Sequence, residues 1–123
     1  MANTTNRTAV DVTLDPELES ALTLSSSDNP SIKLVSNLLT GPNYLSWTRS
    51  MIIALRAKDK LGFVTGKISK PDSNAPEYKK WITVDSMIIS WILNSIFRDL
   101  SDGFLYAPSA HDLWNDIAER FEE

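Results

Sequence analysis

The sequence contains no cysteine and only one histidine, His111. Without cysteine there can be no disulfide, no thiolate metal site and no cysteine nucleophile, and this composition fits a reducing compartment. With one histidine, a zinc site would need a ligand set made almost wholly of carboxylates, which is unusual for that metal. We therefore expect neither a metal nor a cofactor.

Long hydrophobic runs are scarce as well. The first ten residues, MANTTNRTAV, include no apolar stretch, so we expect neither a signal peptide nor a membrane span there. The segment 81–97 is long and apolar, but Asp85 and a stripe of serine and asparagine argue against membrane insertion. The sequence thus predicts a cytoplasmic protein, with the nucleus as the alternative compartment.

Only four glycines are present, and two of them lie in the stretch GFVTGKIS, which looks like a phosphate-binding loop. That loop requires four residues between its glycines and a serine or threonine directly after the lysine. Here three residues separate Gly62 from Gly66, and Ile68 follows Lys67. The spacing therefore argues strongly against a nucleotide-binding loop.

Candidate catalytic groups are equally few. His111 is the only base of suitable resting pKa, and the spacing of the serines gives it no partner. Asp85 is the one carboxylate expected to be partly buried, and a shifted pKa there would suit an acid catalyst. A capping or ion-pairing role beside Lys79 or Arg49 is the favoured interpretation. We expect no catalytic residues and no enzyme.

The charges are unevenly distributed, although the net charge is only −4. Residues 1–42 carry a net −3, residues 43–80 a net +5, and residues 81–123 a net −6. The middle block could meet an anionic partner or the acidic part of another copy. The alternative is that these lysines and arginines are simply solvated.

Hydrophobic periodicity predicts a first helix that begins after Pro42, with Asn43 as its N-cap, and ends at Gly62. Phe63 is a candidate core residue after this stop, and Gly66 permits a reversal of the chain. Apolar side chains at steps of three and four form one buried face of the helix, namely Tyr44, Trp47, Met51 and Leu55.

A second helix is predicted from a cap at Asn74 to about Phe97, because Pro76 and Glu77 complete a capping-box arrangement. It is apolar nearly all round, which is typical of a central helix. A short helix is expected over 99–106. The last helix should begin at Ser109 and have Asp112 at its third position.

These patterns predict an all-α fold, a small bundle of three main helices plus a short fourth. Residues 1–30 are rich in polar residues, so we expect a largely disordered N-terminal arm. Its one apolar cluster, Leu18, Ala21, Leu22 and Leu24, is too short for a stable helix and could form one helical turn. Residues 31–123 would form the helical domain. The four tryptophans lie on apolar stripes, which favours core packing over stacking with nucleic acid bases.

Several motifs occur in order over residues 28–121: DNP, LVSNLLTGPNYLSWTRSMIIALRAKDKLGFVTGKISKP, SWILNSI and DLWNDIAERF. Together they resemble the amino-terminal Gag region of plant copia-type LTR retrotransposons. The most specific parts are NY with a tryptophan three residues on, AL, and KLGF followed by a glycine and a proline. The residues singled out for the resemblance or the core are Asn43, Tyr44, Trp47, Leu55, Gly62, Phe63, Gly66, Trp81, Trp91 and Trp114.

The resemblance implies a capsid-like helical domain that associates with itself into a shell around RNA and has no catalytic activity. Longer Gag polyproteins continue into a zinc knuckle, a protease, an integrase and a reverse transcriptase, and this chain has none of these. We therefore expect a truncated or domesticated element.

The main hypothesis is self-association of a non-enzymatic domain, with the basic block 43–80 against acidic surfaces of another copy, and two alternatives stay open beside it. The first alternative is RNA binding by the basic block, and the other is a host adaptor that holds a partner segment in a groove between helices. We expect no membrane and no small-molecule substrate as partners. The candidate contacts to RNA or to another copy are Arg49, Arg56, Lys58, Lys60, Lys67 and Lys70.

Overall fold

The computed structural model describes residues 15–122, and these are helical apart from loops and one isolated bridge. The predicted all-α class is confirmed. The elements are α2 (Pro16–Ala21), α3 (Tyr44–Ala57), α4 (Leu61–Thr65), α5 (Tyr78–Leu93), α6 (Arg98–Ser101), the 3₁₀ helix η1 (Asp102–Phe104) and α7 (Ala110–Phe121).

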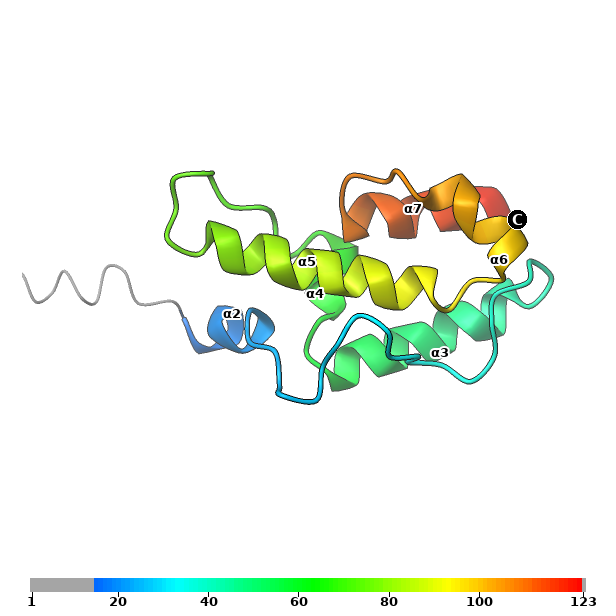
Figure 1. Cartoon of the computed structure of the whole chain (residues 1–123), viewed down its shortest axis with the longest axis horizontal. Coiled ribbons are helices and arrows are strands. Elements are labelled where there is room, and N and C mark those ends of the chain that lie inside the picture. The colour runs from blue at the N-terminus through cyan, green and yellow to red at the C-terminus, as the bar shows by residue number, and fades with distance from the viewer. Residues whose placement is uncertain (1–14, 123) are drawn as a thin grey trace, which may run out of the picture.

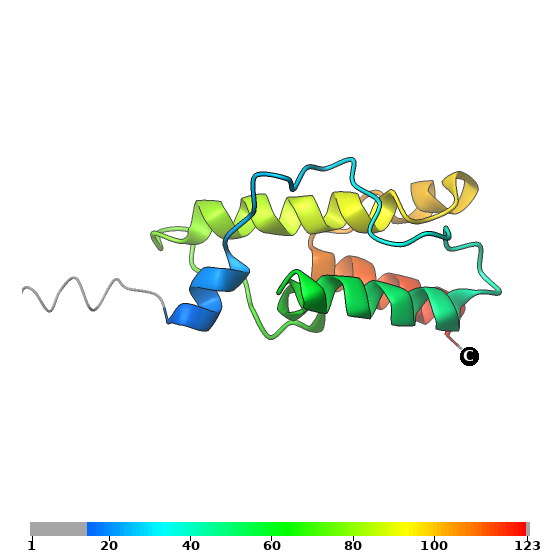
Figure 2. The same cartoon turned by 90° about the horizontal axis from the view of Figure 1, so that it is seen from below.

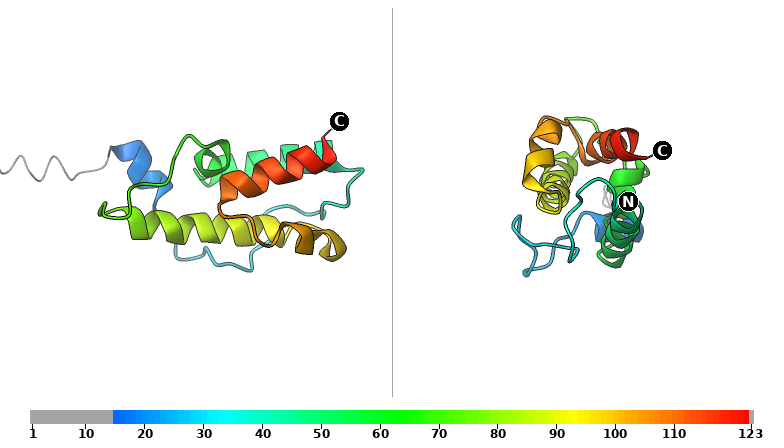
Figure 3. Two further views of the ribbon diagram at one scale, coloured as in Figure 1. Left: turned by 90° about the horizontal axis from the view of Figure 1, so that it is seen from above. Right: turned by 90° about the vertical axis from the view of Figure 1, so that its right-hand side faces the viewer.

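The three longest helices form the bundle. α3, α5 and α7 lie along the long axis of the molecule, and α3 runs in the opposite direction to the other two (Figure 1). Seen down that axis they occupy three corners of a triangle (Figure 3, right). α4 packs against the start of α7, while α6 and η1 lie at the other end of the bundle (Figure 1).

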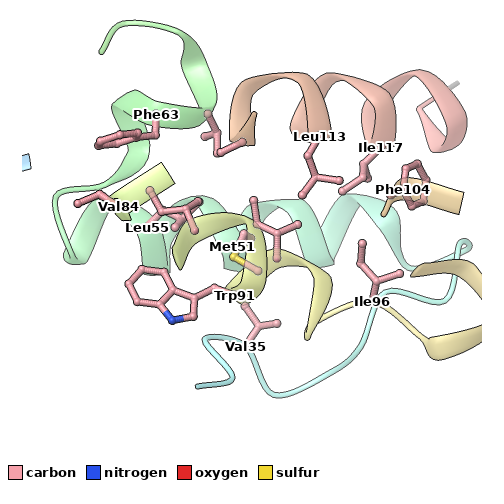
Figure 4. Packing of buried hydrophobic residues seen from close by; sticks show 14 of the residues in the cluster. Val35, Met51, Leu55, Phe63, Val84, Trp91, Ile96, Phe104, Leu113 and Ile117 are labelled. Carbon is pink, nitrogen blue, oxygen red and sulfur yellow. The ribbon is translucent and has the colours of Figure 1, made fainter. Parts of the chain in front are cut away.

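The interior is filled from all three helices. Figure 4 shows side chains of α3, α5 and α7 meeting there, and both Met51 and Trp91 are fully buried. Trp47 of α3 stacks on Trp114 of α7 with ring centroids 5.8 Å apart. Burying one large apolar side chain contributes roughly 1.5–3 kcal/mol, so this shared core holds the helices together.

The buried face of α3 and its start after Asn43 are the predicted ones, but the side-chain cap and the C-terminal end of the helix differ from the prediction. Asn43 makes no side-chain cap. Its Oδ1 accepts from the Thr40 N–H at 2.8 Å, and its Nδ2 donates to the Leu38 carbonyl at 2.9 Å. The Asn43 side chain therefore holds the loop before α3, through the Thr40 N–H and the Leu38 carbonyl, and does not cap the helix.

Gly62 does not end the first helix. α3 ends at Ala57, Asp59 takes a positive φ of 61°, and Gly62 lies inside α4. A Cβ on Gly62 would stand 2.6 Å from Cδ1 of Ile68, so the glycine serves a close approach of the chain. Gly66 is the residue that ends a helix, with a φ of 86° after α4.

The predicted second helix is shorter than expected at both ends. α5 begins at Tyr78, because residues 73–77 form turns and the side chain of Glu77 makes no cap bond. It ends at Leu93, because the chain beyond it joins a parallel bridge between Leu39 and Ile96. Ser95 accepts from the Leu39 N–H at 2.8 Å in that bridge.

The C-terminal prediction holds in most respects. The expected short helix is present as two pieces, α6 and η1. Ser109 caps α7, since its Oγ accepts from the Asp112 N–H at 3.1 Å. The Asp112 carboxylate accepts from the same hydroxyl at 2.9 Å, where a capping box would have it accept from the Ser109 backbone.

Residues 15–30, called the strap from here on, differ from the disordered arm expected over 1–30. They contain α2, and Ala21 and Leu22 are buried in the core. Viewed from below, α2 lies at one end of the bundle and the chain after it runs along α5 (Figure 2). The rest of the expected arm, residues 1–14, lies outside the described residues. The domain boundary at residue 31 stays a prediction.

Candidate interaction surfaces

Both ring nitrogens of the single histidine, His111, lie within hydrogen-bond distance of protein groups. Its Nδ1 lies 2.8 Å from the Val64 carbonyl oxygen, and its Nε2 lies 3.2 Å from Nδ2 of Asn115. A neutral ring that carries its proton on Nδ1 satisfies both contacts. His111 thus ties α4 to α7. Within residues 15–122 no group of three histidine, aspartate or glutamate side chains could hold a metal ion.

Asp85 is buried in α5 and caps the neighbouring helix. Its Oδ1 accepts from the Ala110 N–H, the first residue of α7, at 3.0 Å. Burial raises the pKa of Asp85, and the bond from Ala110 and the charge of Lys70 oppose that rise only in part. The capping role is the one favoured from the sequence, although the capped helix is a distant one and the basic group is Lys70.

Lys60 is buried, so the structure places it away from any surface contact. Only 3% of the residue's surface is exposed. Its Nζ donates to the carbonyl oxygens of Thr23 at 2.9 Å, Lys58 at 3.1 Å and Ser20 at 3.4 Å. Burial lowers the pKa of this ammonium, and the charge of Asp59 opposes the change. Lys60 therefore pins the strap to the end of α3.

Lys58 also turns toward the strap. Its Nζ lies 2.6 Å from Oδ1 of Asp28, whose side chain is 6% exposed, and 5.3 Å from the ring centre of Trp91. The indole of Trp91 donates to the Asn29 carbonyl at 2.8 Å. Among the described residues, Lys58 and Asp28 form the only ion pair. Two of the six candidate basic residues are thus held within the molecule by hydrogen bonds or an ion pair, and Nζ of Lys70 lies 5.8 Å from the ring centre of Tyr78.

The other four candidate bases, Arg49, Arg56, Lys67 and Lys70, are exposed. Arg49 and Arg56 lie on the outer side of α3, together with two exposed apolar residues. Leu45 is 76% exposed and Ile53 49% exposed. Spacings of three and four residues bring these side chains onto one helix face. This set of Leu45, Arg49, Ile53 and Arg56 is called the basic face below.

A second surface has the opposite charge. It comprises α6, η1, the following loop and the outer side of α7, and it includes Leu105 at 51% and Tyr106 at 90% exposure. A cleft of about 490 Å³, lined in part by Leu38, Leu93 and Leu105, adjoins it. Arg98 and Arg120 are its only bases. Its exposed carboxylates are Asp99, Asp102, Asp112, Asp116, Glu119 and Glu122, and together these residues are called the acidic surface.

A cleft of about 440 Å³ separates the strap from the segment that follows α3. Asp15 and Glu17 of the strap line one part of it, and Arg56 and Lys67 line another. Leu61 and Ile68 contribute apolar surface between them. Charges of opposite sign therefore face the same cleft without forming an ion pair.

Most of the residues that carry the family resemblance lie in the core. Tyr44, Trp47, Leu55, Phe63, Trp81 and Trp91 are buried, and Trp114 is partly buried. Sequence reasoning allowed for one helical turn in the strap but missed that this segment packs on the bundle, and it missed the burial of Lys60. Nothing near Lys60 in the sequence marks it as internal.

The chain is similar to one protein family and to two longer relatives. Residues 25–72 match the model of the Gag-polypeptide of LTR copia-type. Two Arabidopsis thaliana proteins are similar to the chain, the Retrovirus-related Pol polyproteins from transposons RE1 and RE2. They are 25% and 26% identical over 88 residues. No solved structure matches.

The alignments cover 64% of this chain and 6% of each relative, so the chain spans a small part of those polyproteins. The matched segment contains Asn43, Trp47 and the glycines of α4 and its end, which are residues that carried the resemblance. In residues 15–122 no helix is long and apolar enough to cross a membrane. The matches confirm the resemblance predicted from the sequence: the chain carries a region similar to copia-type Gag.

Proposed function

We propose that this Gag-like chain has a non-catalytic role and acts by self-association, in which the basic face of one copy docks on the acidic surface of the next. The observation that carries the proposal is the pairing of exposed apolar residues with charges of one sign on α3. This helix contains two arginines and no acidic residue. Among residues 15–122 neither arginine has an ion-pair partner.

The exposed leucine and isoleucine of α3 support a protein partner. Single exposed apolar residues are common, but Leu45 and Ile53 share one face with both arginines. The acidic surface offers a matching arrangement of Leu105 and Tyr106 among carboxylates. Opposite potentials steer two such surfaces together and reject like-charged alternatives.

The contact would be of the heterologous kind, because the basic face and the acidic surface are different parts of the chain. Repeating such a contact produces a ring when the rotation closes and an open array when it does not. Self-association should therefore increase with protein concentration and decrease with salt.

Sedimentation velocity over a range of protein concentrations, at low and at high salt, tests this proposal. The Arg49→Glu, Arg56→Glu variant should be a monomer where the wild type associates. A matched variant, Asp116→Lys with Glu119→Lys, should be a monomer as well. Mixing the two should restore assemblies in which the variants alternate, because each α3 face then meets an α7 surface of opposite charge. A chain carrying all four changes should associate by itself.

A wild type that remains monomeric at high concentration and low salt would contradict self-association. Association that is unaffected by the α3 charge reversal would contradict the basic face as the docking site. The adaptor function stays a prediction, since no feature of the clefts favours it over a second copy.

A further inference from the structure

Large apolar side chains are exposed in two places on the part of the chain that the structure describes. Leu45 and Ile53 belong to the basic face of α3. The others are Phe97, Leu105 and Tyr106, which lie in or beside the cleft of about 490 Å³ next to α6 and η1. Apolar residues gathered in this way mark contact surfaces more strongly than scattered ones do. One group protrudes from a helix and the other borders a hollow, so the two shapes are complementary.

The cleft is formed by segments that the fold holds in place. One wall contains Leu38 and the other contains Leu93 at the end of α5. The isolated bridge ties these walls together, since the Leu39 N–H donates to the Ser95 carbonyl at 2.8 Å and the Phe97 N–H donates to the Leu39 carbonyl at 2.9 Å. The cleft is therefore already formed in the free chain, which reduces the entropy lost when a partner binds.

The charged residues that line the cleft lie on different segments. Lys33 comes from the segment before α3, Arg98 from the start of α6, and Asp102 from the start of η1. An arginine of a partner would be attracted by Asp102 and repelled by the two cations. A helix that carries only positive charge is therefore favoured in one direction, with its arginines on the side of Asp102.

The spacing of residues along α3 matches this direction. Leu45 lies on the first turn of the helix and is 76% exposed, the highest value on the basic face. Arg49 follows on the same face about 6 Å further along the helix axis, and Arg56 lies about 16 Å from Leu45. If Leu45 enters the cleft, Arg49 comes within reach of Asp102. Because η1 packs against α7, Arg56 then reaches the carboxylates of that helix.

We propose that this cleft receives Leu45 from the α3 helix of a second copy, and that Arg49 of the same copy pairs with Asp102. The inference rests on the proposed self-association and adds its anchor and its direction. The first turn of α3 enters the cleft, and the rest of the helix crosses η1 toward α7. Lys33 and Arg98 disfavour the reversed direction.

Disulfide trapping tests the contact, since the chain has no cysteine of its own and an introduced pair reports one contact. Chains with Leu45→Cys are mixed with chains that carry either Leu105→Cys or Asn115→Cys, an exposed and uncharged position on α7. The loss of the leucine weakens both mixtures equally. Non-reducing electrophoresis should show at least about fivefold more heterodimer with Leu105→Cys, because a disulfide requires Cα atoms within about 7 Å.

The outcomes separate this inference from the proposed function. Preferential trapping with Leu105→Cys supports the cleft as the site of the contact. Equal or greater trapping with Asn115→Cys would overturn the cleft and retain docking on the acidic surface. If the wild type stays monomeric and neither pair is trapped above its level in high salt, both this inference and the proposed self-association fail.

A second measurement separates the leucine from the arginine. Leu45→Ala shortens an exposed side chain, so the variant should fold as the wild type does. In sedimentation velocity its association should weaken at least about tenfold with an unchanged salt dependence, because an apolar anchor is lost and no charge is. Leu45→Met should retain most of the association. Wild-type association in Leu45→Ala would overturn the anchor.

The proposed ion pair has its own test. Asp102→Asn and Arg49→Gln should each reduce the salt dependence of association, and the double variant should lose little more than either single variant. Asp116→Asn is the matched control, and its loss should add to that of Arg49→Gln because Asp116 is not the proposed partner. Additive losses from Asp102→Asn and Arg49→Gln would overturn the pairing and with it the direction of the helix.

Discussion

The two stretches of basic residues along α3 and its C-terminal end have opposite environments. Arg49 and Arg56 are exposed on α3, with no ion-pair partner among the residues described. Lys58 and Lys60 follow within four residues, yet one forms an ion pair with the strap and the other is buried among carbonyls. The two arginines thus belong to an exposed surface, whereas the two lysines that follow them hold parts of the fold together.

This difference arises from where the rest of the chain passes. The strap is acidic and crosses the end of α3, so the lysines there find partners that the arginines lack. A buried ammonium is tolerated only when its donors are satisfied, and three carbonyls satisfy those of Lys60. The four basic residues from Arg49 to Lys60 therefore belong to two structures. Arg49 and Arg56 lie on the exposed basic face, whereas Lys58 and Lys60 hold the strap and are called the clasp.

The strongest test of this comparison is Lys60→Met. Methionine has a similar length but no donor, so the Ser20, Thr23 and Lys58 carbonyls lose their partner near a buried position. We expect the free energy of unfolding to fall by about 2–4 kcal/mol. Urea denaturation followed by tryptophan fluorescence measures it. Arg49→Met is the control and should change the free energy of unfolding little. Equal losses in the two variants would show that exposed Arg49 and buried Lys60 contribute alike to stability.

A smaller loss is expected when the ion pair is broken. Asp28→Asn removes the charge that faces Lys58 but keeps an acceptor for the Ser25 N–H, which bonds to Asp28 at 2.9 Å. We expect a destabilisation of about 1–2 kcal/mol. A double-mutant cycle with Lys58→Met should give a coupling energy above about 0.5 kcal/mol. Additive effects of the two changes would show that the pair contributes nothing to the clasp.

The parts of the fold that were predictable from the sequence rest on local patterns. The buried face of α3 follows from a periodicity within one helix, and the Ser109 cap from residues three apart. The errors concern residues whose partners lie elsewhere. Asn43 bonds to the preceding loop, and Lys60 bonds to a segment about forty positions away, so neither environment is encoded in its neighbours.

The clasp should also appear in the pH dependence of stability. Burial alone would raise the pKa of Asp28, but the bonds from Lys58 and the Ser25 N–H outweigh it and the pKa lies below 3.8. The unfolded chain then binds the proton more readily than the folded one, so the stabilisation is present above pH 3.8 and is lost as the pH falls through the lower folded pKa. Urea titrations across this range measure it. The Asp28→Asn variant should lack this pH-dependent part of the stability. If its stability falls at low pH as much as that of the wild type, other carboxylates cause the loss.

The smallest expected effect on stability belongs to the exposed arginines. Arg49→Gln with Arg56→Gln should alter the free energy of unfolding by less than about 0.5 kcal/mol, because both side chains lie in solvent on the outer side of α3. The same double variant should nevertheless reduce self-association, since it removes the charge of the basic face. Denaturation and sedimentation of one preparation compare the two properties directly. A stability loss as large as that of Lys60→Met would mean that the arginines, like the lysines, serve the fold, and the basic face would then have no separate role.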